Sequence, residues 1–103
     1  MNENELQEKY DETKKLTYDV SDPIDDIFNS VEDLCKVAEL ENCLYSERQQ
    51  VNTGYLIVSK QPMFRIDVRK WIRKASVNKM WTNFMTHFRQ VHQELQNTNT
   101  TIN

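Results

Sequence analysis

Glycine and proline are scarce in this chain of 103 residues, which contains one glycine and two prolines. So little glycine excludes collagen-like repeats and glycine-rich phosphate-binding loops, and so few turn residues argue against a turn-dense β-sandwich. The two cysteines, Cys35 and Cys43, are too few for a disulfide scaffold, which indicates a reducing, cytoplasmic setting. The longest apolar run, Tyr55–Val58, is far too short to span a membrane, and the polar first 20 residues predict no signal peptide.

Charge is divided unevenly between the two halves of the sequence. Residues 1–50 contain 14 acids and 5 bases, a net charge of −9, whereas residues 51–103 contain 8 bases and 2 acids, a net charge of +6. A molecule with oppositely charged ends can associate with copies of itself, or can offer its basic end to a polyanion. The same pattern is also consistent with two ordinary solvated faces, because charged side chains normally lie at the surface.

Apolar residues recur with helical spacing along most of the chain, so the sequence predicts an all-α fold, a small bundle of four main helices. We expect these helices to cover residues 23–40, 47–60, 63–74 and 77–96. The run Tyr55–Val58 also suits a buried strand, but no partner strand is evident and a helix is favoured. Residues 20–96 then form the domain, between a polar acidic arm over residues 1–19 and a disordered tail over residues 97–103. A short helix over Glu5–Lys15 is expected to fray.

Capping patterns support three of the expected helix starts. Asp22 followed by Pro23 suits the beginning of the first helix. Ser46 with Gln49 three residues later matches a capping box before the second helix. Ser76 is the expected N-cap of the last helix.

The apolar faces of these helices predict the core. Its expected members are Ile27, Phe28, Val31, Leu34, Tyr55, Val58, Phe64, Trp71, Trp81, Phe84, Phe88 and Leu95. Gly54 lies on the inward face of its helix and would permit a close backbone approach.

No motif predicts a metal site or catalysis. Cys35 and Cys43 are separated from His87 and His92 by a long stretch, no C-x2-C pair occurs, and the two histidines would lie about 140° apart around a helix. The motifs of metalloproteases, serine hydrolases and P-loop enzymes are missing, and a single glycine supplies no oxyanion loop. We therefore expect no enzyme activity, no cofactor and no small-molecule substrate.

Two charged surfaces are the candidate binding sites. The helix over residues 63–74 is basic and amphipathic, and its candidate residues for binding nucleic acid or a partner are Arg65, Arg69, Lys70, Arg73 and Lys74. Clustered cations of this kind bind phosphates weakly and in a salt-sensitive way. The first helix offers a candidate acidic assembly face, made by Asp25, Asp26, Glu32, Asp33 and Glu39, on which the basic helix of a neighbouring copy could dock.

Several short segments resemble the Gag (capsid-like) region of LTR retrotransposons, in particular copia-type or related elements. They are DPIDDIF at residues 22–28, VEDL at 31–34, GYLIVSK at 54–60 and KMWTNFMTHFR at 79–89. The last is the most telling, because Gag-like domains often contain a late helix with the spacing of Trp81, Phe84 and Phe88. The zinc knuckle that often follows in such polyproteins, C-x2-C-x4-H-x4-C, does not occur in these 103 residues.

The resemblance implies an all-helical, shell-forming domain that associates with itself around the element's RNA, without catalysis. The expected partners are therefore other copies of the chain, and RNA bound weakly, with no membrane contact. Two other functions stay open. One is a nucleic-acid-binding module that uses the basic helix, and the other is a helical adaptor that binds a partner helix through an exposed apolar groove.

Overall fold

All regular structure in the computed structural model, which describes residues 3–102 and the side chains of residues 5–98, is helical. In this part of the chain there are five α-helices: α1 (Glu3–Lys14), α2 (Asp25–Leu40), α3 (Glu47–Val58), α4 (Arg65–Ile72) and α5 (Trp81–Ile102). Two short 3-10 helices, η1 (Pro62–Phe64) and η2 (Ser76–Asn78), precede α4 and α5. The all-α prediction is confirmed, with one helix more than expected, and the run Tyr55–Val58 lies in α3 and not in a strand.

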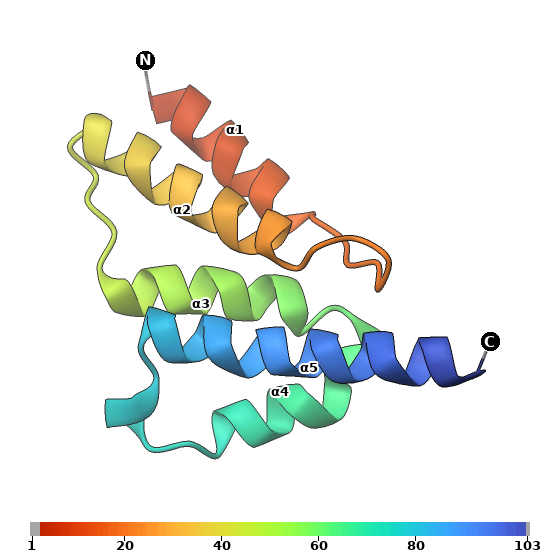
Figure 1. Ribbon diagram of the computed structural model, residues 1–103. Helices are drawn as coiled ribbons and strands as arrows, with labels where there is room; N and C mark the ends of the chain where they lie inside the picture. The colour runs from red at the N-terminus through yellow and green to blue at the C-terminus, as the bar shows by residue number, and fades with distance from the viewer. Residues whose placement is uncertain (1–2, 103) are drawn as a thin grey trace.

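The helices α3 and α5 pack against each other and lie between the other three. On one side of them α1 packs along α2, and both contact α3, whereas α4 packs against α5 on the opposite side (Figure 1). This order places the acidic N-terminal helices and the basic α4 at opposite sides of the molecule (Figure 1).

The helix α1 lies where a polar, fraying arm was expected. Leu6 and Tyr10 are partly buried, and Thr13 is buried with its hydroxyl donating to the carbonyl oxygen of Lys9 at 2.7 Å. A helix this short is marginal in isolation, but packing against neighbouring helices can stabilise it. The contacts of α1 with α2 and α3 supply that packing. Residues 1 and 2 lie outside the described part.

The last helix differs from its prediction at both ends. Ser76 begins η2 and not a long helix, Val77 is 78% exposed, and α5 begins only at Trp81. The backbone N–H of Trp81 donates to the Oε2 atom of Glu47 at 3.0 Å, so a carboxylate from α3 satisfies an N-terminal donor of α5. At the other end α5 continues to Ile102. The described part of the expected disordered tail is therefore helical, and residue 103 lies outside it.

The expected end of α2 at Leu40 and the expected start of α3 at Glu47 are confirmed, whereas α2 begins two residues late, α3 ends two residues early, and α4 is two residues shorter at each end. The capping box is present, with Gln49 N–H donating to Ser46 Oγ at 3.1 Å and Ser46 N–H donating to Gln49 Oε1 at 2.7 Å. By contrast α2 begins at Asp25, and its N-terminal end has no side-chain cap, so Asp22 does not have the capping role that was expected.

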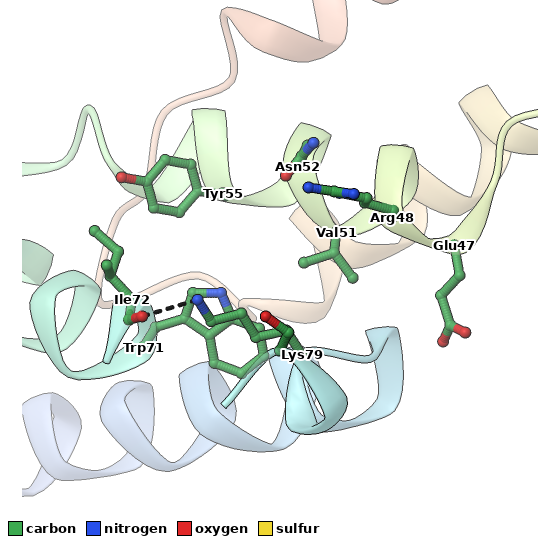
Figure 2. Close-up of a pocket in the computed structure, with 9 residues that line it drawn as sticks. Glu47, Arg48, Val51, Asn52, Tyr55, Trp71, Ile72 and Lys79 are labelled. Carbon is green, nitrogen blue, oxygen red and sulfur yellow. Dashed lines mark hydrogen bonds between the residues drawn. The ribbon is translucent and has the colours of Figure 1, made fainter. Parts of the chain in front are cut away.

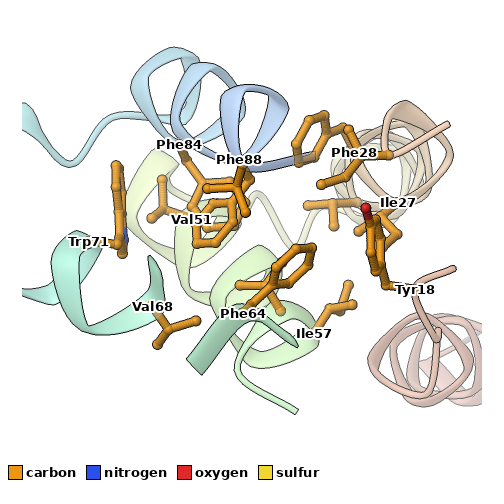
Figure 3. Packing of buried hydrophobic residues seen from close by; sticks show 14 of the residues in the cluster. Tyr18, Ile27, Phe28, Val51, Ile57, Phe64, Val68, Trp71, Phe84 and Phe88 are labelled. Atoms are coloured by element: carbon orange, nitrogen blue, oxygen red, sulfur yellow. The ribbon is translucent and has the colours of Figure 1, made fainter. Parts of the chain in front are cut away.

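The core forms from the predicted apolar faces. The predicted members that are buried are Ile27, Phe28, Val31, Leu34, Val58, Phe64, Trp71, Trp81, Phe84 and Phe88. Tyr55 and Leu95 are only partly buried and pack against this cluster. Figure 3 shows Phe84 and Phe88 pointing from α5 into the centre, where they face Trp71 of α4 and Phe28 of α2.

Gly54 permits the closest approach between α3 and α5, as expected. A Cβ atom at this position would lie 2.7 Å from Cε1 of Phe84 and 3.1 Å from Cζ3 of Trp81. Only a residue without a side chain leaves room for these two rings against the backbone of α3.

Candidate functional site

The surface that we call the basic face of α4 consists of Arg65, Arg69 and Lys70 in the helix, and of Arg73 and Lys74 in the turn directly after it, all of which are exposed. Their orientation follows from the opposite face of the same segment, where Phe64, Val68 and Trp71 are buried in the core. Ile66 lies among the basic residues and is 64% exposed. The fold therefore brings the five predicted residues together on one solvent-facing surface.

These five cations are little used within the molecule. In the part of the chain that the structure describes, none of them forms an ion pair, and Lys74 alone lies over a ring, 5.8 Å from the centroid of Trp71. The neighbouring Lys79 instead serves the fold, because its Nζ atom donates to the carbonyl oxygen of Ile72 at 2.8 Å, at the end of α4. The charge of the basic face is thus available to a partner.

The predicted acidic face is only partly available. Asp26, Asp33 and Glu39 are exposed, but Asp25 accepts two hydrogen bonds from Arg89 at 2.9 and 3.1 Å. These hydrogen bonds and the nearby charge of Asp25 raise the pKa of the Arg89 guanidinium.

Glu32 is also engaged inside the fold. Its Oε2 atom accepts the indole N–H of Trp81 at 2.9 Å. Asp25 and Glu32 therefore hold α5 against α2, and the acidic surface left for a partner is smaller on α2 than expected. Helix α1 adds the exposed acids Glu8 and Glu12 to this acidic surface. We call the acids on the exposed surfaces of α1 and α2 the acidic layer; its members are Glu8, Glu12, Asp26, Asp33 and Glu39.

A buried polar cluster, which sequence reasoning missed, joins the segment after α1 to α3 and α5. The Tyr18 hydroxyl is hydrogen-bonded to Nδ1 of His92, and the Tyr18 N–H donates to Oε1 of Gln61 at 3.3 Å. The Gln61 amide nitrogen donates to the carbonyl oxygens of Ile57 at 3.0 Å and Leu16 at 3.4 Å. Burial, with a smaller effect of the Asp19 charge, raises the pKa of Tyr18 to about 12. A phenol held neutral in this way is suited to a structural hydrogen bond and not to nucleophilic catalysis.

The remaining histidine and the cysteines do not converge. Nε2 of His87 is hydrogen-bonded to the carbonyl oxygen of Asp67 at 3.0 Å. Cys35 is half-buried, which together with the Glu32 charge raises its thiol pKa, and Cys43 is exposed. Among the described residues, no group of three or more His, Cys, Asp or Glu side chains is placed to hold a metal ion. A search of the same residues finds no helix with the length and apolar character that a membrane crossing requires.

A hollow of about 530 Å³ lies between α3 and the segment that runs from α4 to η2 (Figure 2). Val51, Trp71 and Ile72 form its apolar floor, and Arg48 and Lys79 place two cations at its rim. Tyr55 also lines it, which explains why this predicted core residue is only partly buried. We call this feature the α3–η2 hollow. Its volume is in the range of ordinary binding pockets.

Comparison of the chain with protein-family models, with curated protein sequences and with solved structures finds no significant match.

Proposed function

We propose that this protein is a non-enzymatic self-association module, in which the basic face of one copy docks on the acidic layer of the next. The observation that carries the proposal is the placement of these two surfaces on opposite sides of the α3–α5 pair (Figure 1). A contact between two different surfaces of the same molecule is heterologous. It continues from copy to copy until a ring closes or a filament forms.

The exposed charges of the two surfaces favour pairing between copies, because they make few contacts within one molecule. The basic face has no ion pair among the described residues, and Asp26, Asp33 and Glu39 are exposed on α2. Exposed ion pairs are individually weak, at about 0–1 kcal/mol each, and salt screens them. We therefore expect weak association that several pairs together stabilise and that high salt reverses.

A role in a particle shell, of the kind that the Gag resemblance implies, is one form of this proposal. The all-helical fold and the burial of Trp81, Phe84 and Phe88 on one face of α5 are compatible with it. RNA would bind the same basic face, so in such an assembly RNA and the acidic layer would compete for it.

The test is sedimentation velocity of the whole chain over a range of protein concentrations, at low salt and at about 1 M salt, where the Debye length falls to about 3 Å. We expect oligomers larger than a dimer at low salt, and we expect these to be lost at high salt. Arg69→Gln with Arg73→Gln should weaken them. Lys15→Gln with Lys36→Gln is the matched control, because it removes the same charge from exposed positions outside the basic face. A protein that stays monomeric at low salt up to millimolar concentration would overturn the proposal.

A second candidate function, binding of single-stranded RNA, rests on the five exposed cations of the basic face, which form no ion pair with any residue that the structure describes. Five phosphate contacts would give a slope of about −3.5 in a plot of log K against log salt. Filter binding at low salt measures it, and changing all five basic residues to Gln should abolish binding. Unchanged affinity in that variant would exclude the basic face as the RNA site.

A further inference from the structure

The turn between α2 and α3 presents two leucines to solvent. Leu40 is 78% exposed and Leu44 is 74% exposed. They flank a helix C-cap in which Asn42 adopts a positive φ of 59°, with its N–H donating to the carbonyl oxygen of Glu39 at 3.1 Å. The N–H of Cys43 donates to the carbonyl oxygen of Ala38 at 2.8 Å, which completes a Schellman motif. Residues 39–44, which we call the knuckle, are therefore held in one shape by backbone hydrogen bonds.

A receiving surface lies at the same end of the molecule. The knuckle leads directly into α3, whose first half lines the α3–η2 hollow, and η2 closes the far rim (Figures 1 and 2). Ile72, which lines the hollow, is 49% exposed, and Val77 in the adjoining η2 is 78% exposed. Exposed apolar side chains at a hollow are features of association sites.

We propose that two copies of this chain form a two-fold symmetric dimer in which each inserts its knuckle leucines into the α3–η2 hollow of the other. The charges of the two surfaces favour a second copy as the occupant. The knuckle carries the exposed Glu39 and the negative end of the α2 dipole. The rim of the hollow carries Arg48 and Lys79 against one acid, Glu47, whose Oε2 atom already accepts the N–H of Trp81, so Arg48 is the main cation that the rim offers.

The position of both surfaces at one end of the molecule suits a closed dimer. In an isologous contact, the same patch of each copy must contain both complementary parts. Here the knuckle precedes the start of α3, and residues of α3 itself line the hollow. The heterologous contact of the charged surfaces uses α1, α2 and α4, and the two contacts share only Glu39, at the end of α2. The dimer goes beyond the proposed function, and its leucine contacts do not depend on the charged surfaces.

Salt separates the two kinds of contact. Burial of leucine side chains is not screened by salt, whereas pairing of exposed charges is. Sedimentation at about 1 M salt should therefore leave a dimer that does not grow into larger species. Leu40→Ser with Leu44→Ser should weaken this dimer by about tenfold or more, because two apolar anchors are removed. Ile66→Ser with Met63→Ser is the matched control, since it removes two exposed apolar side chains from another surface, and it should leave the dimer unchanged.

A variant of the hollow tests the other half of the contact. Asn52 is exposed and lines the hollow, so Asn52→Trp should fill the hollow and weaken the dimer without disturbing the core. Asn29→Trp, at an exposed position of α2, is its control. A mixture of the Asn52→Trp protein with the double leucine variant should form a heterodimer of intermediate affinity, because one knuckle and one hollow are still intact. Two variants that are merely misfolded would not complement each other, and circular dichroism of each variant checks the fold.

The exposed thiol of Cys43 lies between the two leucines and reports on the contact without mutation. Its rate of alkylation by a maleimide at about 1 M salt should fall as protein concentration rises, while the slower reaction of Cys35 should not change. A rate independent of concentration, with a monomer in sedimentation, would overturn the dimer and leave the knuckle to a different partner. A high-salt dimer that is unaffected by the leucine changes would also overturn it. Low-salt oligomers that lack this contact would overturn the dimer while sparing the proposed function.

Discussion

Gly54→Ala is the sharpest test of the packing between α3 and α5. The added Cβ would lie 2.7 and 2.9 Å from two ring carbons of Phe84, distances at which the ring or the helix must move. The centroid of the Phe84 ring lies 5.4 Å from that of Trp81, which stacks on it, and 4.9 Å from that of Phe88. The Phe84 ring therefore has little freedom to move. Trp71 approaches it edge-on at 5.4 Å.

Two effects oppose each other in this substitution, and their magnitudes predict the sign of the change in the free energy of unfolding. Replacing a glycine by alanine inside a helix contributes about 1 kcal/mol of stability. Overpacking a filled core typically costs about 1–3 kcal/mol, and the confined ring places this site at the upper end. We therefore expect Gly54→Ala to lower the free energy of unfolding by about 2 kcal/mol. That change corresponds to a fall in Tm on the order of 10 °C for a domain of this size.

Urea and thermal unfolding followed by circular dichroism measure this difference. The matched control is Asn52→Ala, two residues earlier on the exposed side of the same helix, where the alanine gains helix propensity and meets no ring. It should leave stability unchanged or raise it by a few tenths of a kcal/mol. A Gly54→Ala protein that is as stable as the wild type, or more stable, would show that the two helices are not in the contact described.

Three further predictions concern residues that hold α5 in place. Trp81→Ala should cost about 3–5 kcal/mol in urea unfolding, and a loss below about 1 kcal/mol would mean that the ring is not buried. Tyr18→Phe leaves buried His92 without its partner and should cost about 1–3 kcal/mol. Because the folded pKa of Tyr18 is about 12 against 10.0 for the free side chain, its contribution is complete below pH 10 and is lost as pH rises from 10 to 12. The Tyr18→Phe protein should therefore lose less stability across that interval, and equal slopes would contradict this. A double-mutant cycle with Asp25→Asn and Arg89→Gln should give a coupling of about 0.2–1 kcal/mol that shrinks with added salt, since both side chains are about half exposed; a coupling that salt does not change would refute the surface ion pair.

Local patterns were sufficient to predict most of the helices and much of the core. The capping box of Ser46 and Gln49 needs only residues three apart, and the buried face of α5 follows from the spacing of Trp81, Phe84 and Phe88. Such features depend on the chain's own periodicity, which is present in the sequence.

Features that depend on distant residues were not predicted. The start of α5 is set by Glu47, 34 positions earlier, and so a local N-cap at Ser76 was the wrong expectation. A short helix over Glu5–Lys15 was expected to fray, because its packing on α2 and α3 is not visible in the local sequence. The buried cluster was missed, since its Tyr18 and His92 are 74 residues apart.

The acidic surface illustrates why the candidate site could be predicted only in part. An acid off the apolar stripe of a helix is expected to face solvent, yet Asp25 and Glu32 meet Arg89 and Trp81 of α5. The basic residues of α4 have no such neighbour among the described residues, and all five lie on the surface where periodicity placed them.

The two carboxylates that hold Trp81 have an optical consequence. The indole N–H is bound by α2, through Glu32, and the backbone N–H is bound by α3, through Glu47. Emission from this indole therefore responds to whether three separate helices have come together, and not merely to the formation of α5. The other tryptophan, Trp71, is buried and lies edge-on to Phe84, the ring on which Trp81 stacks. Both fluorophores therefore contact the same core ring, and their emission reports on the folding of the bundle without an added dye.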